Sequence, residues 1–257
     1  LCAAVFVLAA GMLNRLALFL SPVALLIVWG YSYLKRFTSL CHFLLGLCLA
    51  IAPVGAWVAV RASIGFPALV LGLAVLLWTA GFDIIYATQD LDFDRARGLP
   101  SAPCRLGIGP ALALSAAVHA AAFAALAWFR VLSRLGNVFL IGLAVAAAML
   151  VYQHAIVRPS DLRRVNAAFF TANGVVSVAL LFFGLADPLQ RLAQEAGNGF
   201  GDHAAFLGAG SALDEHVQVQ LLRRQAFQSI LADGAEAILL HILEQAVLQV
   251  CIPQLSS

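Results

Sequence analysis

Charged residues are scarce in this sequence. Only 11% of its 257 residues are charged, whereas 63% are hydrophobic, and the mean hydropathy is +0.95. Soluble globular chains carry about 25% charged residues, so this composition excludes an ordinary soluble domain. The net charge of +2 is too small to indicate a nucleic-acid-binding protein. We therefore expect an all-α integral membrane protein, because helices satisfy their own backbone hydrogen bonds in lipid.

Cysteine motifs are also absent. The five cysteines form no CxxC pair and no Cys/His ligand spacing, so neither a thiolate metal site nor a disulfide framework is expected. The chain begins inside an apolar run without a basic leader. We interpret residues 1–13, about 20 Å of helix, as a membrane span cut short at its N-terminus.

Apolar segments dominate the rest of the chain up to residue 185. They recur between short polar breaks, and each full segment is close to the ~20 residues that a membrane helix needs. The pattern predicts a multi-span helical bundle with seven visible spans, at residues 1–13, 16–34, 43–60, 67–85, 110–129, 137–157 and 166–185.

The basic residues predict an orientation. Most of them lie in alternate breaks, namely Lys35, Arg36, Arg95, Arg97, Arg105, Arg158, Arg163 and Arg164. The intervening breaks contain only Arg15, Arg61, Arg130 and Arg134. By the positive-inside rule the first group faces the cytoplasm. We expect an integral protein of a bacterial inner membrane, with its active site on the cytoplasmic side.

The character of the chain changes after residue 186. Residues 194–203, "QEAGNGFGDH", are rich in Gly and Asn and predict a linker. Residues 213–252 carry two amphipathic helical patterns. We therefore divide the chain into a membrane domain, residues 1–186, and a linker with an amphipathic helical tail, residues 187–257. A peripheral hairpin, a partner-binding appendage and non-native sequence all remain open for this tail.

Four aspartates lie at or just after the end of the span at residues 67–85, in the stretch "GFDIIYATQDLDFDRARGLPS". On a continuous helix Asp83, Asp90 and Asp94 share one stripe, while Asp92 lies nearly opposite. An aspartate that faces lipid costs about 2.5 kcal/mol or more, which favours a bound cation or a wet cavity. Magnesium takes oxygen ligands, often one or two carboxylates with phosphates and water. Asp90 and Asp94 supply two carboxylates one turn apart, although a solvated helix end paired with arginines has the same spacing.

The surrounding residues resemble the UbiA superfamily of intramembrane aromatic prenyltransferases. The stretch "DIIYATQDLDFDRARGLPSAPCRLG" is similar to the second aspartate-rich motif of that family. "YSYLKRF" is similar to its Tyr-x-x-x-Lys-Arg element, and "RVNAAFFTANGVVSVALLFFG" to its last membrane helix. The resemblance covers roughly residues 1 to 186 and is greatest to the branch that acts on 4-hydroxybenzoate and related menaquinone-pathway aromatics.

The resemblance implies a site and a reaction. It implies that Asp90 and Asp94 bind Mg²⁺ bridged to a polyprenyl diphosphate, with Asp83 facing the same cavity as a ligand or an orienting acceptor. The other implied residues are the diphosphate contacts Tyr31, Lys35, Arg36 and Arg105, and the cavity residues Tyr86, Asn166 and Asn173. Lys35 is the only lysine, and a membrane-surface anchor is the alternative reading of Lys35 and Arg36. The implied partners are the prenyl donor, a small aromatic acid and membrane lipid.

Polar residues within the spans have a simpler interpretation. His42, His119 and His154 lie in or near predicted spans, as do Asn166 and Asn173, which are seven residues apart and thus on one helical face. For each residue taken singly, a polar link between helices is the more common role.

The sequence departs from the family pattern in one respect. The family has nine membrane helices and two aspartate-rich motifs, and the first motif, of Asn-Asp-x-x-Asp type, has no match here. We therefore expect about two helices to be missing upstream and the chain alone to be inactive. A non-catalytic remnant and a transporter with intramembrane aspartates remain alternatives.

Overall fold

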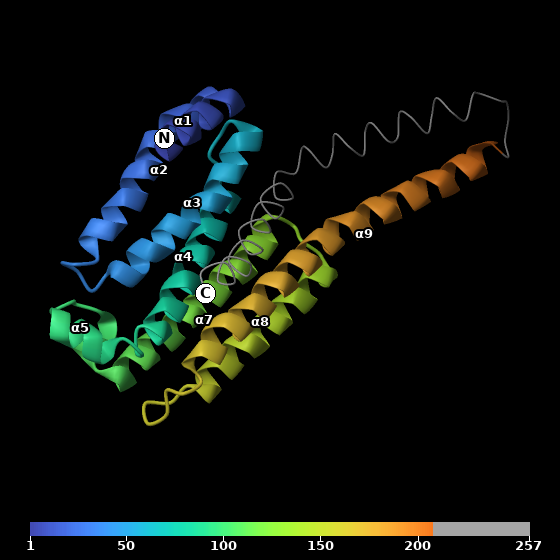
Figure 1. Cartoon of the computed structure of the whole chain (residues 1–257). Coiled ribbons are helices and arrows are strands. Elements are labelled where there is room, and N and C mark those ends of the chain that lie inside the picture. Colours follow the sequence, from blue (N-terminus) through green and yellow to red (C-terminus); the bar gives the residue numbers. More distant parts are fainter. Residues whose placement is uncertain (208–257) are drawn as a thin grey trace.

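A computed structural model describes the backbone of residues 1–207 and the side chains of residues 1–194. This part of the chain is helical and contains no strand (Figure 1). Its elements are α1 (Cys2–Leu13), α2 (Arg15–Leu34), α3 (Cys41–Arg61), α4 (Phe66–Tyr86), α5 (Leu91–Arg97), α6 (Ala102–Leu106), α7 (Ile108–Leu132), α8 (Asn137–Ile156), the π-helical segment η1 (Ala167–Ala172) and α9 (Asn173–Leu207).

The predicted spans are confirmed as helices. Their ends differ by a few residues, except that the last span, predicted to end at residue 185, continues as helix to Leu207. Six of these helices are long and apolar enough to cross a membrane, the last of them running from η1 into α9, while α1 is a shorter apolar helix. Local signals explain several ends. Asn14 accepts a hydrogen bond from the Ala17 N–H at the start of α2, at 2.9 Å, as an N-cap does. Pro67 lies in the first turn of α4, where its missing N–H has no intrahelical partner anyway.

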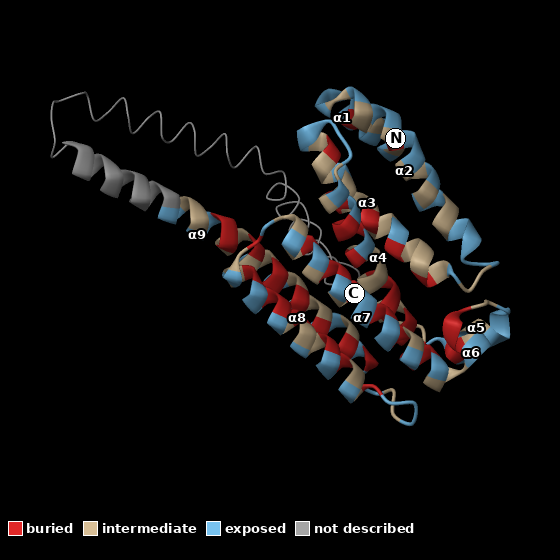
Figure 2. Cartoon of the chain, turned by 180° about the vertical axis from the view of Figure 1, so that it is seen from behind, coloured by how far each residue is buried: buried red, intermediate tan, exposed pale blue. Residues whose placement is uncertain are grey.

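Helix α4 is the centre of the bundle. It packs most extensively against α3 and α7, and 56% of its most apolar stretch is buried, against 6% for α2. Figure 2 shows this difference: buried residues run along α4, α7 and α8, while α1 and α2 are mainly exposed. The approach of α3 to α4 depends on Gly46, because a Cβ there would lie 2.2 Å from the Leu76 carbonyl oxygen. Small residues at such crossings are typical of membrane helices.

The main core lies where α4, α7, α8 and α9 meet. Its largest members are apolar side chains that are almost fully buried, including Leu71, Leu126, Phe129, Phe139, Leu143 and Leu180. The start of α4 belongs to this core, whereas the end of α4 that precedes the aspartates is buried in two smaller clusters through Ile84 and Ile85.

The predicted linker at residues 194–203 is wrong as a description of the backbone. Helix α9 continues without a break through this stretch to Leu207. The Gly and Asn content lowers helix propensity, but α9 enters the stretch already formed and packed on α8. The amphipathic patterns predicted at residues 213–252 lie outside the described residues.

Candidate active site

The sequence-predicted site residues gather at one end of the bundle. The turn between α2 and α3, the short helices α5 and α6, and the loop between α8 and η1 all lie at the lower end in Figure 1. These connections contain Lys35, Arg36, Arg95, Arg97, Arg105, Arg158, Arg163 and Arg164, as well as Asp90, Asp92 and Asp94. One end of the bundle is therefore both basic and rich in carboxylates.

Asp83 lies in the last turn of α4 and is bonded to a buried histidine. Its Oδ2 is 2.6 Å from Nδ1 of His42, which belongs to the first turn of α3. The His42 side chain is 3% exposed, and the Asp83 side chain is 24% exposed. On its other side, His42 Nε2 accepts a hydrogen bond from the Ala102 N–H at the start of α6, at 3.2 Å. One imidazole thus connects α3, α4 and α6.

Helix α4 does not continue through the aspartate segment, so the predicted single stripe is wrong. It ends at Tyr86, and residues 87–90 form tight turns in which the N–H groups of Thr88, Gln89 and Asp90 bond three residues back. The buried Thr88 also donates its hydroxyl to the Ile85 carbonyl at 2.7 Å, which draws that carbonyl away from a regular helix. Turns of this kind rotate roughly 20° further per residue than an α-helix. The continuous helix that the predicted stripe requires is therefore interrupted between Asp83 and Asp90.

Asp90 and Asp94 nevertheless keep their mutual spacing. Asp90 precedes α5, and the Asp94 N–H donates to the Asp90 carbonyl at 2.7 Å, so the two residues are one turn apart. Asp90 and Asp92 are exposed and Asp94 is partly exposed. None of these three side chains forms an ion pair or hydrogen bond with another described residue. Gly98, in the left-handed conformation with φ of 66°, ends α5.

The donor chemistry of this pair fits magnesium, but the protein alone does not complete a metal site. Among the described residues, no group of three or more His, Cys, Asp or Glu side chains is close enough to hold a metal ion. Mg²⁺ usually takes one or two carboxylates and completes its shell with phosphate and water oxygens. Asp90 and Asp94 supply carboxylate oxygens of that kind, without a competing protein partner in the described part of the chain.

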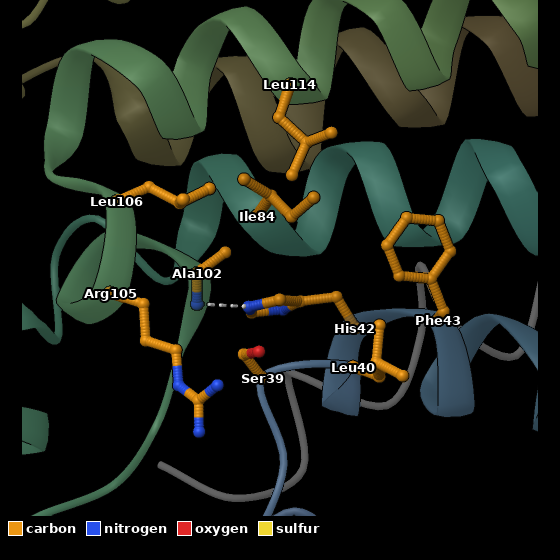
Figure 3. Close-up of a pocket in the computed structure, with 9 residues that line it drawn as sticks. All are labelled: Ser39, Leu40, His42, Phe43, Ile84, Ala102, Arg105, Leu106 and Leu114. Carbon is orange, nitrogen blue, oxygen red and sulfur yellow. Dashed lines mark hydrogen bonds between the residues drawn. The ribbon is translucent and has the colours of Figure 1, made fainter.

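Arg105 contributes to a cavity beside His42. The cavity has a volume of about 270 Å³ and lies between the starts of α3 and α7, the end of α4, and α6 (Figure 3). Its polar groups come from Ser39, His42 and Arg105, and its walls are apolar, with Phe43, Ile84 and Leu114 among them. Figure 3 shows the Arg105 guanidinium at the edge of the cavity and the His42 ring against Ala102. Arg105 therefore lies near the His42–Asp83 pair rather than in a distant loop.

The predicted phosphate contacts at the end of α2 are open. Tyr31 is half-buried in the last turn of α2, and its carbonyl accepts the Lys35 N–H at 3.0 Å. Lys35 and Arg36 are exposed in the turn that leads towards α3. Neither side chain forms an ion pair with a described residue. Both are thus available to an anion or to the membrane surface.

Tyr86, Asn166 and Asn173 line one contact between α4 and the η1–α9 segment. The Asn173 Oδ1 accepts the Trp78 indole N–H at 3.2 Å, and the Asn166 Oδ1 accepts from the Gln89 side chain at 3.1 Å. Between them, Phe169 packs on Tyr86 with ring centroids 4.6 Å apart. The expected common face of the two asparagines and their links between helices are confirmed. η1, which separates them, is a π-helical segment, a feature often found at functional sites.

The sequence interpretation missed the pairing of His42 with Asp83. It identified His42 as a polar link between helices, which is confirmed, but gave it no partner. The two residues are 41 positions apart, and no local spacing connects them. His119 and His154 likewise form a link, 2.9 Å apart across α7 and α8.

Comparisons with known proteins agree with this arrangement. The model of the UbiA prenyltransferase family matches residues 1–175. The 4-hydroxybenzoate octaprenyltransferase of Nitrosospira multiformis is 32% identical over 167 residues, which cover 63% of this chain and 56% of that protein. The protein of the same name from Serratia proteamaculans is 29% identical over 174 residues, covering 68% of this chain and 59% of the relative. The chain therefore spans little more than half the length of these curated relatives.

A solved structure has the same fold. The apo structure of a UbiA homolog from Aeropyrum pernix K1 matches with a TM-score of 0.61 and 30% identity, over 70% of this chain and 68% of that one. The resemblance first seen in the aspartate motif thus extends over most of the helical bundle. This chain belongs to the UbiA prenyltransferase family.

Proposed function

We propose that this chain takes part in aromatic prenylation: transfer of a polyprenyl group from a polyprenyl diphosphate to a small aromatic acid such as 4-hydroxybenzoate, in ubiquinone or menaquinone biosynthesis. The observation that carries the proposal is the pair of carboxylates at Asp90 and Asp94. They are one turn apart, unpaired within the described chain, and at the end of the bundle where basic residues gather. The names of the curated relatives support the choice of acceptor.

The pair would hold Mg²⁺ through carboxylate oxygens. When bound, the ion supplies positive charge that stabilises the departing diphosphate. Lys35, Arg36 and Arg105 add fixed positive charge from three positions near the same end of the bundle. Such preorganised charge acts most strongly where negative charge develops in the transition state. The allylic C–O bond then breaks and diphosphate departs with its electron pair. The ring carbon beside the hydroxyl bonds to the allylic carbon, and the ring regains aromaticity when that ring carbon loses its proton to solvent or to the departing diphosphate.

The contact between α4 and η1 would protect the allylic cation. Tyr86, Phe82 and Phe169 form an aromatic group there, with ring centroids 4.6 and 5.2 Å apart. An apolar wall excludes water, which would otherwise capture the cation. Asn166 and Asn173 are bonded to α4 and its following turn, so in this proposal they fix the wall rather than contact the reacting carbon.

The orientation proposed for this site is cytoplasmic. Eight of the basic residues in the polar breaks lie at the same end as the aspartates, namely Lys35, Arg36, Arg95, Arg97, Arg105, Arg158, Arg163 and Arg164, whereas Arg15, Arg61, Arg130 and Arg134 lie at the opposite helix ends. The positive-inside rule assigns the richer end to the cytoplasm. In a bacterial inner membrane the site would then meet water-soluble acids from the cytoplasm, and the prenyl chain would extend into lipid.

The test is a transfer assay on membranes that contain the full-length gene product. Radiolabelled polyprenyl diphosphate is supplied with a panel of phenolic acids, with either Mg²⁺ or EDTA present. We expect labelled product with 4-hydroxybenzoate or a close relative, and we expect EDTA to remove it. Membranes that contain a known 4-hydroxybenzoate octaprenyltransferase serve as the positive control. If they form product and membranes with this protein prenylate no acceptor, the proposed function is wrong.

A further inference from the structure

We propose that His42 is a positioning residue for Asp83 in the prenyl-transfer site. By bonding Asp83 and the backbone of α6 at once, His42 sets the direction of the carboxylate and places Arg105 relative to it. This inference rests on the proposed function, which it extends to a residue outside the aspartate motif.

The hydrogen-bond pattern around His42 determines its role. The Ala102 N–H can only donate, so Nε2 of His42 must present its lone pair to it, at 3.2 Å. In a neutral imidazole the other nitrogen then carries the proton. Nδ1 therefore donates to Asp83 Oδ2 at 2.6 Å. This arrangement needs no charge on the ring, because each nitrogen already has the partner that the neutral form requires.

His42 is buried behind Asp83, whose carboxylate remains partly exposed. His42 is 3% exposed and its ring cannot swing out without breaking both bonds, whereas Asp83 keeps 24% of its side chain exposed. Its second oxygen, Oδ1, has no hydrogen-bond partner among the described residues. His42 thus fixes one carboxylate oxygen from behind and leaves the other available. Metal-site and catalytic groups are commonly oriented by such outer partners, whose loss costs about 10–100-fold.

His42 also attaches the segment that follows the metal-binding pair. Ala102 begins α6, which carries Arg105 at the edge of the same cavity. Residues 91–106 run from α5 into α6, so the bond from Ala102 to His42 fastens the far end of the segment that starts at Asp90. One side chain therefore couples the position of Asp83 to that of Arg105.

Two substitutions separate this role from simple packing. His42→Phe keeps a flat ring but removes both bonds. His42→Gln places an amide N–H and an amide oxygen about as far apart as the two ring nitrogens, so it can donate to Asp83 and accept from Ala102. His119→Phe is the matched control, because His119 is also buried, at 1% exposure, and also bonds a backbone group, the Trp78 carbonyl, at 3.2 Å.

The experiment measures steady-state transfer and Mg²⁺-dependent binding of a non-cleavable prenyl thiodiphosphate in the full-length gene product. We expect His42→Phe to lower kcat/KM for the prenyl diphosphate about 10–100-fold and to weaken analogue binding. His42→Gln should stay within about threefold of the unmodified protein for both readouts, and His119→Phe should lower the melting temperature without this loss. In an Asp83→Ala background, His42→Phe should cost less than in the unmodified protein, because the part of its effect that acts through Asp83 is already lost.

Three results would overturn the inference alone. They are unchanged transfer in His42→Phe, equal losses in His42→Phe and His42→Gln, and losses that add fully to those of Asp83→Ala. If the unmodified protein transfers no prenyl group while a known relative does, the proposed function fails first and this inference fails with it.

Discussion

The aspartates of the described chain fall into two groups that differ in their surroundings. Three are bonded by other protein groups: Asp83 by His42, Asp161 by Arg163, and Asp187 by two backbone N–H groups and Arg191. Three are unbonded, with no side-chain hydrogen bond or ion pair to a described residue: Asp90, Asp92 and Asp94. A carboxylate whose oxygens are already bonded stabilises the fold, whereas an unbonded one is available to a ligand.

The position of the two groups strengthens this distinction. Asp187, only 2% exposed, is a residue of α9 that bonds the backbone at the start of α8, the helix end opposite to the one that leads into the basic 158–164 connection. The unbonded group lies between the end of α4 and α5, next to basic connections. Asp83 lies between these extremes, since one oxygen is bonded and the side chain remains partly exposed. Mutations in each group should therefore move different measurements.

The largest effect is expected from the unbonded pair. Asp90→Asn or Asp94→Asn removes a carboxylate that we propose as a Mg²⁺ ligand, and we expect prenyl transfer to fall by at least about 100-fold, as when a transition-state-stabilising group is lost. Both residues are at least partly exposed and have no protein partner in the described chain. The stability should therefore change by less than about 0.5 kcal/mol. Transfer in membranes and the melting temperature in detergent are the two measurements.

Asp92→Asn is the matched control for that pair. Asp92 is exposed on the same short helix and is likewise unbonded, but it is not one turn from either member of the pair. We expect it to keep transfer within about threefold, since surface substitutions away from a site have small effects. Equal losses in Asp90→Asn and Asp92→Asn would show that general negative charge, rather than a defined pair, supports the reaction.

For Asp187 we expect a loss of stability and no loss of prenyl transfer. Its carboxylate accepts the Gly136 N–H at 2.6 Å and the Phe139 N–H at 3.2 Å, and so caps α8 from another helix. Asp187→Ala leaves both donors without that acceptor, and each such loss costs about 1–3 kcal/mol. We expect the melting temperature to fall clearly, while transfer per folded molecule stays the same. Asp187→Asn keeps an acceptor oxygen, so its melting temperature should fall less than that of Asp187→Ala. If a stable Asp187→Asn protein lost prenyl transfer, Asp187 would have a role in the reaction and not only in stability.

Sequence reasoning succeeded where the physical signal is local. Runs of about twenty apolar residues predicted the helices, and all their ends but the last to within a few residues, because a chain in lipid has few alternatives to a helix. The left-handed Gly98 was predictable for the same reason, since glycine favours that conformation. The roles assigned to Asp90, Asp94, Tyr31, Lys35, Arg36 and Arg105 stay predictions.

Sequence reasoning failed where a tertiary contact or a competing hydrogen bond decided the outcome. The single stripe of carboxylates assumed a continuous helix, but Thr88 takes the Ile85 carbonyl and tightens the backbone into turns. The His42–Asp83 bond joins residues 41 positions apart, which depends on the packing of α3 against α4. The helical backbone at residues 194–203 follows from an already formed α9 and outweighs the propensity of its glycines.

A smaller stability effect should come from the support behind Asp83. Gly81 lies two residues before Asp83, and a Cβ there would be 2.3 Å from His119 Cδ2 and 2.4 Å from its Nε2. Gly81→Ala must displace His119 and weaken its bond to the Trp78 carbonyl, at a cost of about 1–3 kcal/mol typical of overpacking. Gly55→Ala is the control, because nothing lies within 4 Å of a Cβ at that position. Equal melting temperatures for the two variants would show that α4 and α7 shift freely, and Asp83 would then lack a rigid support.

The smallest effect should come from Asp161, which is bonded yet exposed. The Arg163 side chain donates to both of its oxygens at 3.0 Å, and this bonding lowers the pKa of Asp161 to about 2. Because the pKa is lower in the folded state than the usual 3.8, the ionised carboxylate favours folding. Its contribution is complete above about pH 4 and disappears as the pH falls through about 2. Arg163→Ala should therefore lower the melting temperature slightly at pH 6, and this difference should vanish near pH 2. Water screens so exposed a pair strongly, so a difference that is large, or that persists at pH 2, would mean that Arg163 contacts the bundle through something other than Asp161.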